Sequence, residues 1–175
     1  MADPIIQTFN YTLDPVIQIS GLLYLLGSLT VSSLSDLRRL AAQKDFSEVW
    51  GAFTILLLTL DMYLLLIGSI PGIALLLKWA LILSFTVLTT TGKIFRISTM
   101  DVTAITALLA LLNPAEILLA GLILLLANEL LHPFLKKFGE AGAYPFLPVV
   151  FTVNLLLITY HLLGGPNAIN QITLT

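Results

Sequence analysis

In the segment Ile97-Ser-Thr-Met-Asp101-Val-Thr-Ala-Ile-Thr-Ala-Leu-Leu-Ala-Leu-Leu-Asn113-Pro114, one carboxylate stands at the start of a largely apolar helix. About thirteen residues run from Asp101 to Asn113, which at roughly 1.5 Å per residue makes only about 20 Å of helix. Asn113-Pro114 predicts the end of this helix, because a residue before proline disfavours the α conformation. A hydrocarbon core is about 30 Å thick. An acid at the start of so short a membrane helix is expected to face protein or water, so Asp101 is a candidate functional residue.

The composition of the chain places it among membrane proteins. Of its 175 residues, 58% are hydrophobic and 10% are charged, whereas soluble proteins average about 25% charged residues. Its apolar blocks are continuous, as in residues 73–77 and 121–126, and do not show the alternation typical of membrane β-barrels. We therefore expect an all-α, polytopic protein of the cell membrane, with residues 1–175 forming a single membrane-embedded domain.

Several kinds of chemistry are excluded or left without support by the sequence. The chain has no cysteine, which excludes disulfides, thiolate catalysis and cysteine-bound zinc or iron-sulfur clusters. The net charge of −2 leaves no basic stripe for nucleic acid. We expect no metal and no cofactor, and the lipid bilayer is the first partner that the sequence indicates.

Charged and proline-containing segments divide the chain into six predicted membrane helices. Pro71-Gly72 predicts a tight turn between the second and third helices, and Asn113-Pro114 separates the fourth from the fifth. Tyr144-Pro-Phe-Leu-Pro148 introduces the last helix. The six expected helices cover approximately residues 15–39, 48–70, 72–91, 101–113, 115–131 and 148–163.

Basic residues are concentrated in alternate loops. Seven of the eight lie in the first, third and fifth loops, and the exception is Lys78 in the third helix. These seven are Arg38, Arg39, Lys44, Lys93, Arg96, Lys136 and Lys137. The positive-inside rule assigns those loops to the cytoplasm and both termini to the outside. Asp36, at the end of the first helix, and Asp101, at the start of the fourth, are then predicted to lie at the same depth.

Two carboxyl groups at one depth could form an aspartyl protease dyad. Close carboxylates in a poorly solvated site share a proton. One then activates water as a general base, while the protonated partner polarises a peptide carbonyl. Asp36 and Asp101 could in this way hydrolyse a peptide bond on the cytoplasmic side of a substrate's apolar helix.

Three strings carry a family resemblance. Ser33-Leu-Ser-Asp36-Leu-Arg38-Arg39 resembles the first-aspartate region of the type IV prepilin peptidases. The stretch from Asp101 to Pro114 is similar to the second-aspartate region of that family, and Tyr144-Pro-Phe-Leu-Pro148 to its proline-containing entry to the last helix. The archaeal preflagellin peptidases are the most similar in length. Where the family has glycines before the second aspartate, this chain has Ser98 and Met100.

The resemblance implies a GxGD-type intramembrane aspartyl protease with six helices. Its catalytic residues would be Asp36 and Asp101, and it would use no metal or cofactor. Its substrates would be pilin- or flagellin-like precursors of the archaeal type IV pilus kind, from which it would remove the basic leader.

Both aspartates also have structural interpretations. Ser98-Thr-Met-Asp101 has the form of a capping box, in which the two side chains satisfy the first backbone groups of the helix. Asp36 could pair with Arg38 or Arg39 at the interface, a contact worth about 0–1 kcal/mol when exposed. Each alternative explains an acid at that position without catalysis.

A third acid, Asp61, is predicted in the middle of the second helix, where a charge costs at least about 2.5 kcal/mol. We expect it to pair with Lys78 on the adjoining helix. Near the end of the fifth helix, Glu129 is expected to join an interhelical polar cluster with its neighbours. The alternative function is a non-catalytic assembly partner, or a small proton-coupled carrier that uses Asp61, Lys78 and Glu129. Trp50 and Trp79 are predicted to be interfacial anchors.

Overall fold

The computed structural model describes residues 13–39, 44–95, 97–139 and 144–164. Within these ranges the chain is all-helical, with one 3₁₀ turn at Lys136–Phe138 and no strand, which confirms the predicted class. The helices are α2 (Pro15–Arg39), α3 (Lys44–Leu66), α4 (Gly72–Thr90), α5 (Thr99–Ala110), α6 (Pro114–Leu135) and α7 (Leu147–Leu162). The loop cation Arg96 and the side chains of Arg39 and Lys44 lie outside the described residues.

Four of the helices, α2, α3, α4 and α6, are long and apolar enough to cross a membrane. The other two are shorter. α5 has 12 residues and α7 has 16, which correspond to about 18 Å and 24 Å of helix. The chain therefore has the character of a membrane protein, with two short helices packed among four long ones.

The bounds of three helices differ from the predicted ones. α5 spans Thr99–Ala110 in place of the expected 101–113. α3 begins at Lys44 and ends at Leu66, earlier than the expected 48–70. Asp45 in its first turn favours a helix N-terminus, and Gly68 adopts a φ of 72°, a left-handed conformation that follows many helix ends. α6 continues past Pro133 to Leu135, beyond the expected end at residue 131.

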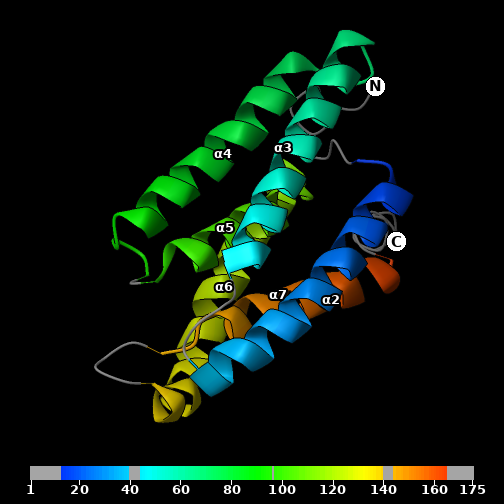
Figure 1. Cartoon of the computed structure of the whole chain (residues 1–175). Coiled ribbons are helices and arrows are strands. Elements are labelled where there is room, and N and C mark those ends of the chain that lie inside the picture. Colours follow the sequence, from blue (N-terminus) through cyan, green and yellow to red (C-terminus); the bar gives the residue numbers. More distant parts are fainter. Residues whose placement is uncertain (1–12, 40–43, 96, 140–143, 165–175) are drawn as a thin grey trace, which may run out of the picture.

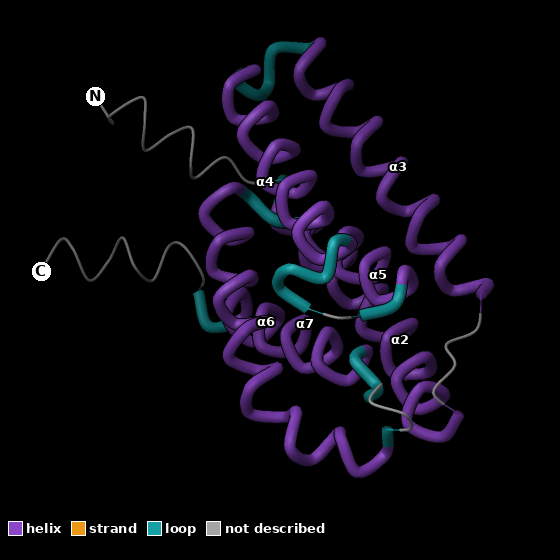
Figure 2. Tube along the Cα trace, turned by 90° about the vertical axis from the view of Figure 1, so that its left-hand side faces the viewer, coloured by secondary structure: helices purple, strands orange, loops and turns teal. Residues whose placement is uncertain are grey.

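The short helix α5 lies at the centre of the packing. It contacts α2, α3, α4 and α7, and most of its side chains are buried. α2 and α7 lie side by side and antiparallel, so that the start of α2 is near the end of α7 (Figure 1, Figure 2). Gly21 of α2 faces Leu111 at the end of α5, and a Cβ added to Gly21 would lie 2.5 Å from the side chain of Leu111. The sequence decides this close approach, because only glycine leaves that space.

The predicted interfacial role of Trp50 is wrong. Its side chain is fully buried, its indole N–H donates to the hydroxyl of Ser28 at 3.0 Å, and its ring stacks on Phe46. A buried tryptophan needs a partner for its single donor, and Ser28 of α2 supplies it. Trp50 therefore joins α3 to α2 inside the bundle.

Candidate functional site

Asp36 of α2 caps the first turn of α7. The residue is only 8% exposed, and its Oδ2 accepts a hydrogen bond from the backbone N–H of Leu147 at 3.3 Å. The N-cap residue of α7, Phe146, makes no side-chain capping bond of its own. A carboxylate from a distant helix thus satisfies one of the backbone donors that every helix N-terminus leaves open.

Asp101 forms the capping box predicted at the start of α5. Its Oδ2 accepts from the backbone N–H of Ser98 at 2.9 Å and from the Ser98 hydroxyl at 2.8 Å, and its own N–H donates to that hydroxyl at 3.3 Å. Ser98 has φ −72° and ψ 162°, an extended conformation that any residue adopts. The backbone at Ser98 therefore does not require the glycine that the resembled family carries there.

The structure brings the two aspartates to one end of the bundle. The rings of Phe95, in the loop before α5, and Phe146, before α7, lie 5.1 Å apart, which joins the loop of Asp101 to the turn that Asp36 caps. Both carboxyl groups are largely buried, and they are close enough for the charge of Asp36 to act on Asp101. The influence of Asp36 on Asp101 is smaller than that of burial and of the two bonds to Ser98.

Tyr144 is a further member of this site that the sequence did not single out as a functional residue. Its hydroxyl donates to Oδ1 of Asn128 on α6 at 2.6 Å, and its ring contacts His132 and Phe146. Burial raises the pKa of the Tyr144 hydroxyl, and the charges of Asp101 and Glu129 raise it further. Tyr144 thus joins α6 to the aspartates; the signal for it was a tyrosine directly before the proline of a helix entry.

The predicted pairing of Asp61 with Lys78 is confirmed. The Lys78 ammonium donates to Asp61 Oδ2 at 2.7 Å, and the indole N–H of Trp79 donates to the same oxygen at 2.9 Å. Asp61 is 0% exposed and Lys78 1%. This bond explains how two charged residues can stand inside a membrane-type bundle, since a buried pair with added hydrogen bonds offsets much of its desolvation cost.

Glu129 lies apart from that pair. It is exposed, and thirteen residues separate it from Glu116 at the other end of α6, a distance of about 20 Å along the helix. The acid that acts electrostatically on Lys78, besides Asp61, is Glu116. In the expected cluster at the end of α6, the bond of Asn128 goes to Tyr144.

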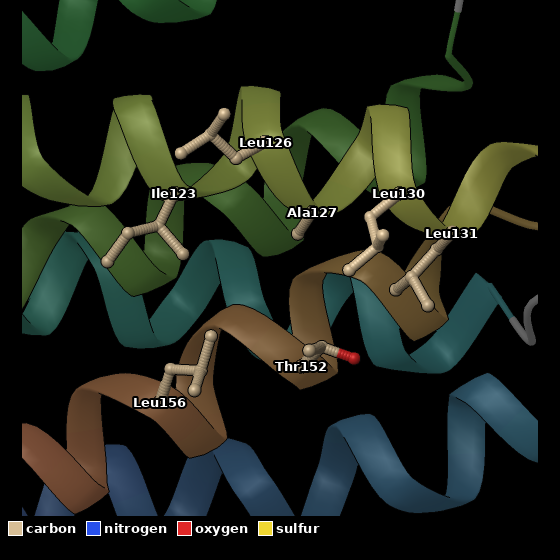
Figure 3. A pocket seen from close by; sticks show the side chains of 7 residues that line it. All are labelled: Ile123, Leu126, Ala127, Leu130, Leu131, Thr152 and Leu156. Carbon is tan, nitrogen blue, oxygen red and sulfur yellow. The ribbon is translucent and has the colours of Figure 1, made fainter.

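An apolar groove runs between α6 and α7 (Figure 3). Its volume is about 330 Å³. It is lined by Ile123, Leu126, Ala127, Leu130 and Leu131 from α6 and by Thr152 and Leu156 from α7. The Thr152 hydroxyl is bonded to its own helix, at the carbonyl of Pro148. The lining of the groove is therefore almost entirely hydrocarbon.

The groups at the Asp36 end of the bundle that can transfer protons include the carboxyl groups of Asp36 and Asp101, the phenol of Tyr144 and the imidazole of His132, whose ring contacts Tyr144. Within the described residues, no three histidine, aspartate or glutamate side chains gather as a metal site. A buried carboxyl pair can perform general acid and base chemistry. Comparison of the chain with protein-family models, curated proteins and solved structures finds no match to any of them.

Proposed function

We propose that the chain is a membrane aspartyl endopeptidase that cleaves pilin- or flagellin-like precursors. The observation that supports the proposal is that Asp36 and Asp101, 65 positions apart in the sequence, are both largely buried at one end of the bundle, where the charge of Asp36 acts on Asp101. The resemblance of the strings around both residues to the prepilin peptidases points in the same direction.

The described hydrogen bonds suit a division of labour between the two acids. The bonds from Leu147 to Asp36 and from Ser98 to Asp101 go to Oδ2, and Oδ1 is the atom that the mechanism would use. One Oδ1 would carry the shared proton and donate it to the peptide carbonyl, while the other would take a proton from the attacking water. The capping bonds would hold both carboxyl groups in place, and backbone donors favour the ionised form of the acid that they contact.

The proposed topology has six membrane helices with both termini outside. It is supported by the basic residues of the loops beside the two acids, such as Lys93 and Lys136, because such loops remain in the cytoplasm. The dyad would then act at the cytoplasmic end of a substrate's apolar helix, where the basic leader begins.

The test is cleavage of a co-expressed pilin-like precursor in membranes by the chain and by Asp36→Asn and Asp101→Asn. Acid and base groups each contribute about 10²–10⁴-fold, so each variant is expected to lose at least about 99% of the cleavage rate. Asp45→Asn is the matched control, because Asp45 is an exposed acid on α3 and its loss should leave cleavage intact. Retained cleavage in both dyad variants would remove the proposal.

The buried pair of Asp61 and Lys78 supports a second candidate, a small proton-coupled carrier. Intramembrane acids and lysines commonly mark ion or proton pathways, and here Glu116 lies close enough to act on the same lysine. Proteoliposomes with an internal pH dye distinguish the candidates. Proton flux that Asp61→Asn abolishes and Asp36→Asn leaves unchanged favours the carrier, and absence of both flux and cleavage favours a non-catalytic assembly partner.

A further inference from the structure

A second polar cluster lies at the end of the bundle remote from the two aspartates. Gln18 stands eighteen residues before Asp36 on α2, about 27 Å along the helix. Its side-chain amide donates to Oε2 of Glu116 on α6 at 2.7 Å. Nε2 of His161 on α7 lies 3.6 Å from the other oxygen, Oε1, of the same carboxyl group. Glu116 therefore sits where the ends of α2, α6 and α7 converge, and it is only 3% exposed.

The bonding of Glu116 is uneven. Its Oε2 accepts from Gln18 and from the backbone N–H of Asn113 at 3.1 Å. Its Oε1 and Nε2 of His161 are both buried, and neither has a hydrogen-bond partner. A separation of 3.6 Å is longer than a hydrogen bond but within reach of an ion pair. Two buried, unpartnered atoms that face each other require a proton between them, since otherwise both keep an uncompensated desolvation cost.

The neighbouring charges determine whether the negative charge of Glu116 has a counter-charge when His161 is neutral. Glu116 acts electrostatically on Lys78. The ammonium of Lys78 is bonded to the carboxylate of Asp61, so most of its positive charge is already balanced. Tyr160 is near enough for Glu116 to act on it, and phenols are neutral below about pH 10. Gln18 is neutral at any pH. The negative charge of Glu116 is therefore left without a full counter-charge unless His161 carries one.

We propose that Glu116 and His161 form a proton-binding site. A proton from water adds to Nε2 of His161 and gives an imidazolium, whose N–H donates to Oε1 of Glu116; when the proton leaves, the charged bond is lost. Because Gln18 holds the opposite oxygen of the same carboxylate, one proton ties the end of α7 to the starts of α2 and α6. His161 stands one residue before the end of α7.

The sign of the resulting pH dependence follows from the bond. The ion pair exists only in the folded protein and only with a protonated ring. The contact among the three helices is therefore expected to weaken when the ring loses this proton. Loss of the proton removes the charged contact between Glu116 on α6 and His161 on α7.

The test is ¹⁵N-histidine NMR of the full chain in nanodiscs. The chain has only two histidines, so His132→Gln leaves the His161 signals alone in the spectrum. At pH 7 we expect both ring nitrogens of His161 to be protonated, and Glu116→Gln to shift the ring to the neutral form. Glutamine can replace glutamate in a capping box, so this variant keeps the bond from Asn113. A His161 ring that is neutral in the unmodified chain, with its proton on Nε2, would overturn the proposal.

Thermal unfolding provides a second readout that does not depend on the NMR signals. Between pH 6 and pH 8.5 the melting temperature should fall more for the unmodified chain and for the control His132→Gln than for His161→Gln. His132 is a suitable control because it lies at the opposite end of α6, half-buried, with its ring against Tyr144. Equal pH dependence in His161→Gln and in the unmodified chain would also overturn the proposal.

Discussion

The carboxylate of Asp36 accepts a hydrogen bond from the N–H of Leu147 at 3.3 Å, so the last turns of α2 cap the first turn of α7. Asp36 is thereby a structural residue whatever chemistry it performs. Any test of catalysis at this position has to separate loss of the carboxylic acid from loss of the cap.

Two substitutions at Asp36 make this separation. Asp36→Ala removes the acceptor and is expected to lower the free energy of unfolding by about 0.5–2 kcal/mol, the range measured for helix caps. Asp36→Asn keeps an oxygen that can accept from Leu147 and should lose less than half of that. Thermal and chemical denaturation in nanodiscs measures both, with Asp45→Asn as the exposed control. Equal losses in the two variants would show that the cap contributes little and the negative charge most.

The pair of Asp61 and Lys78 predicts a strongly non-additive double-mutant cycle. Lys78→Met leaves a buried carboxylate without its cation and should cost about 3–5 kcal/mol. The double variant Asp61→Leu with Lys78→Met removes both charges, and it is expected to be far less damaging than the sum of the single changes. Unfolding free energies of the four proteins give the coupling energy. Additive losses would mean that the two side chains do not stabilise each other.

The titration of Tyr144 reports its distance from Asp101. Burial and the nearby acids raise the pKa of its hydroxyl, so the folded state keeps this proton longer than the unfolded state, and stability falls as the pH rises above about 10. Asp101→Asn removes one of the charges that raise it and should lower the pKa, whereas Asp45→Asn should not. Ultraviolet absorbance of the phenolate, with Tyr144→Phe to identify the signal, follows this change. An unaltered titration in Asp101→Asn would place the two groups apart.

Two glycines of α2 provide a matched pair for the packing on α5. Gly21→Ala puts a methyl group 2.5 Å from the side chain of Leu111, which is fully buried and cannot swing aside freely. Overpacking of this kind costs about 1–3 kcal/mol. At Gly27 the added methyl meets nothing within 4 Å, so Gly27→Ala should be neutral or slightly stabilising through helix propensity. A melting temperature that falls equally in both variants would contradict the close approach of α2 and α5.

The helices themselves could be predicted from the sequence because the apolar runs and their interruptions are local signals. The capping box of Ser98 and Asp101 was readable for the same reason: its residues are three apart on one segment. The partner of Asp61 was also predictable, since an acid and a lysine on consecutive apolar helices have few other ways to be buried. In each case the relevant residues lie in one helix or in two that follow each other.

The long-range contacts could not be predicted in this way. Nothing near Asp36 in the sequence indicates that its carboxylate accepts a hydrogen bond from the backbone N–H of Leu147, which lies 111 residues away. Trp50 was misplaced because its burial depends on Ser28 of another helix, and the pattern of a single apolar helix does not reveal which face a neighbour covers. Glu116 stands two residues after Pro114 in the sequence, and only the packing of α2 and α7 around it reveals its contacts with Gln18 and His161.

The ion pair of Asp61 on α3 with Lys78 on α4 affects how these two helices enter a bilayer. Each helix alone would bring an uncompensated charge into hydrocarbon, at about 2.5–3.5 kcal/mol on insertion scales. Joined by the short turn at Pro71, the two helices carry Asp61 and Lys78 already bonded, and the hairpin is neutral in its interior. Biogenesis is therefore expected to favour joint partitioning of this hairpin over stepwise release of its two halves from the insertion machinery.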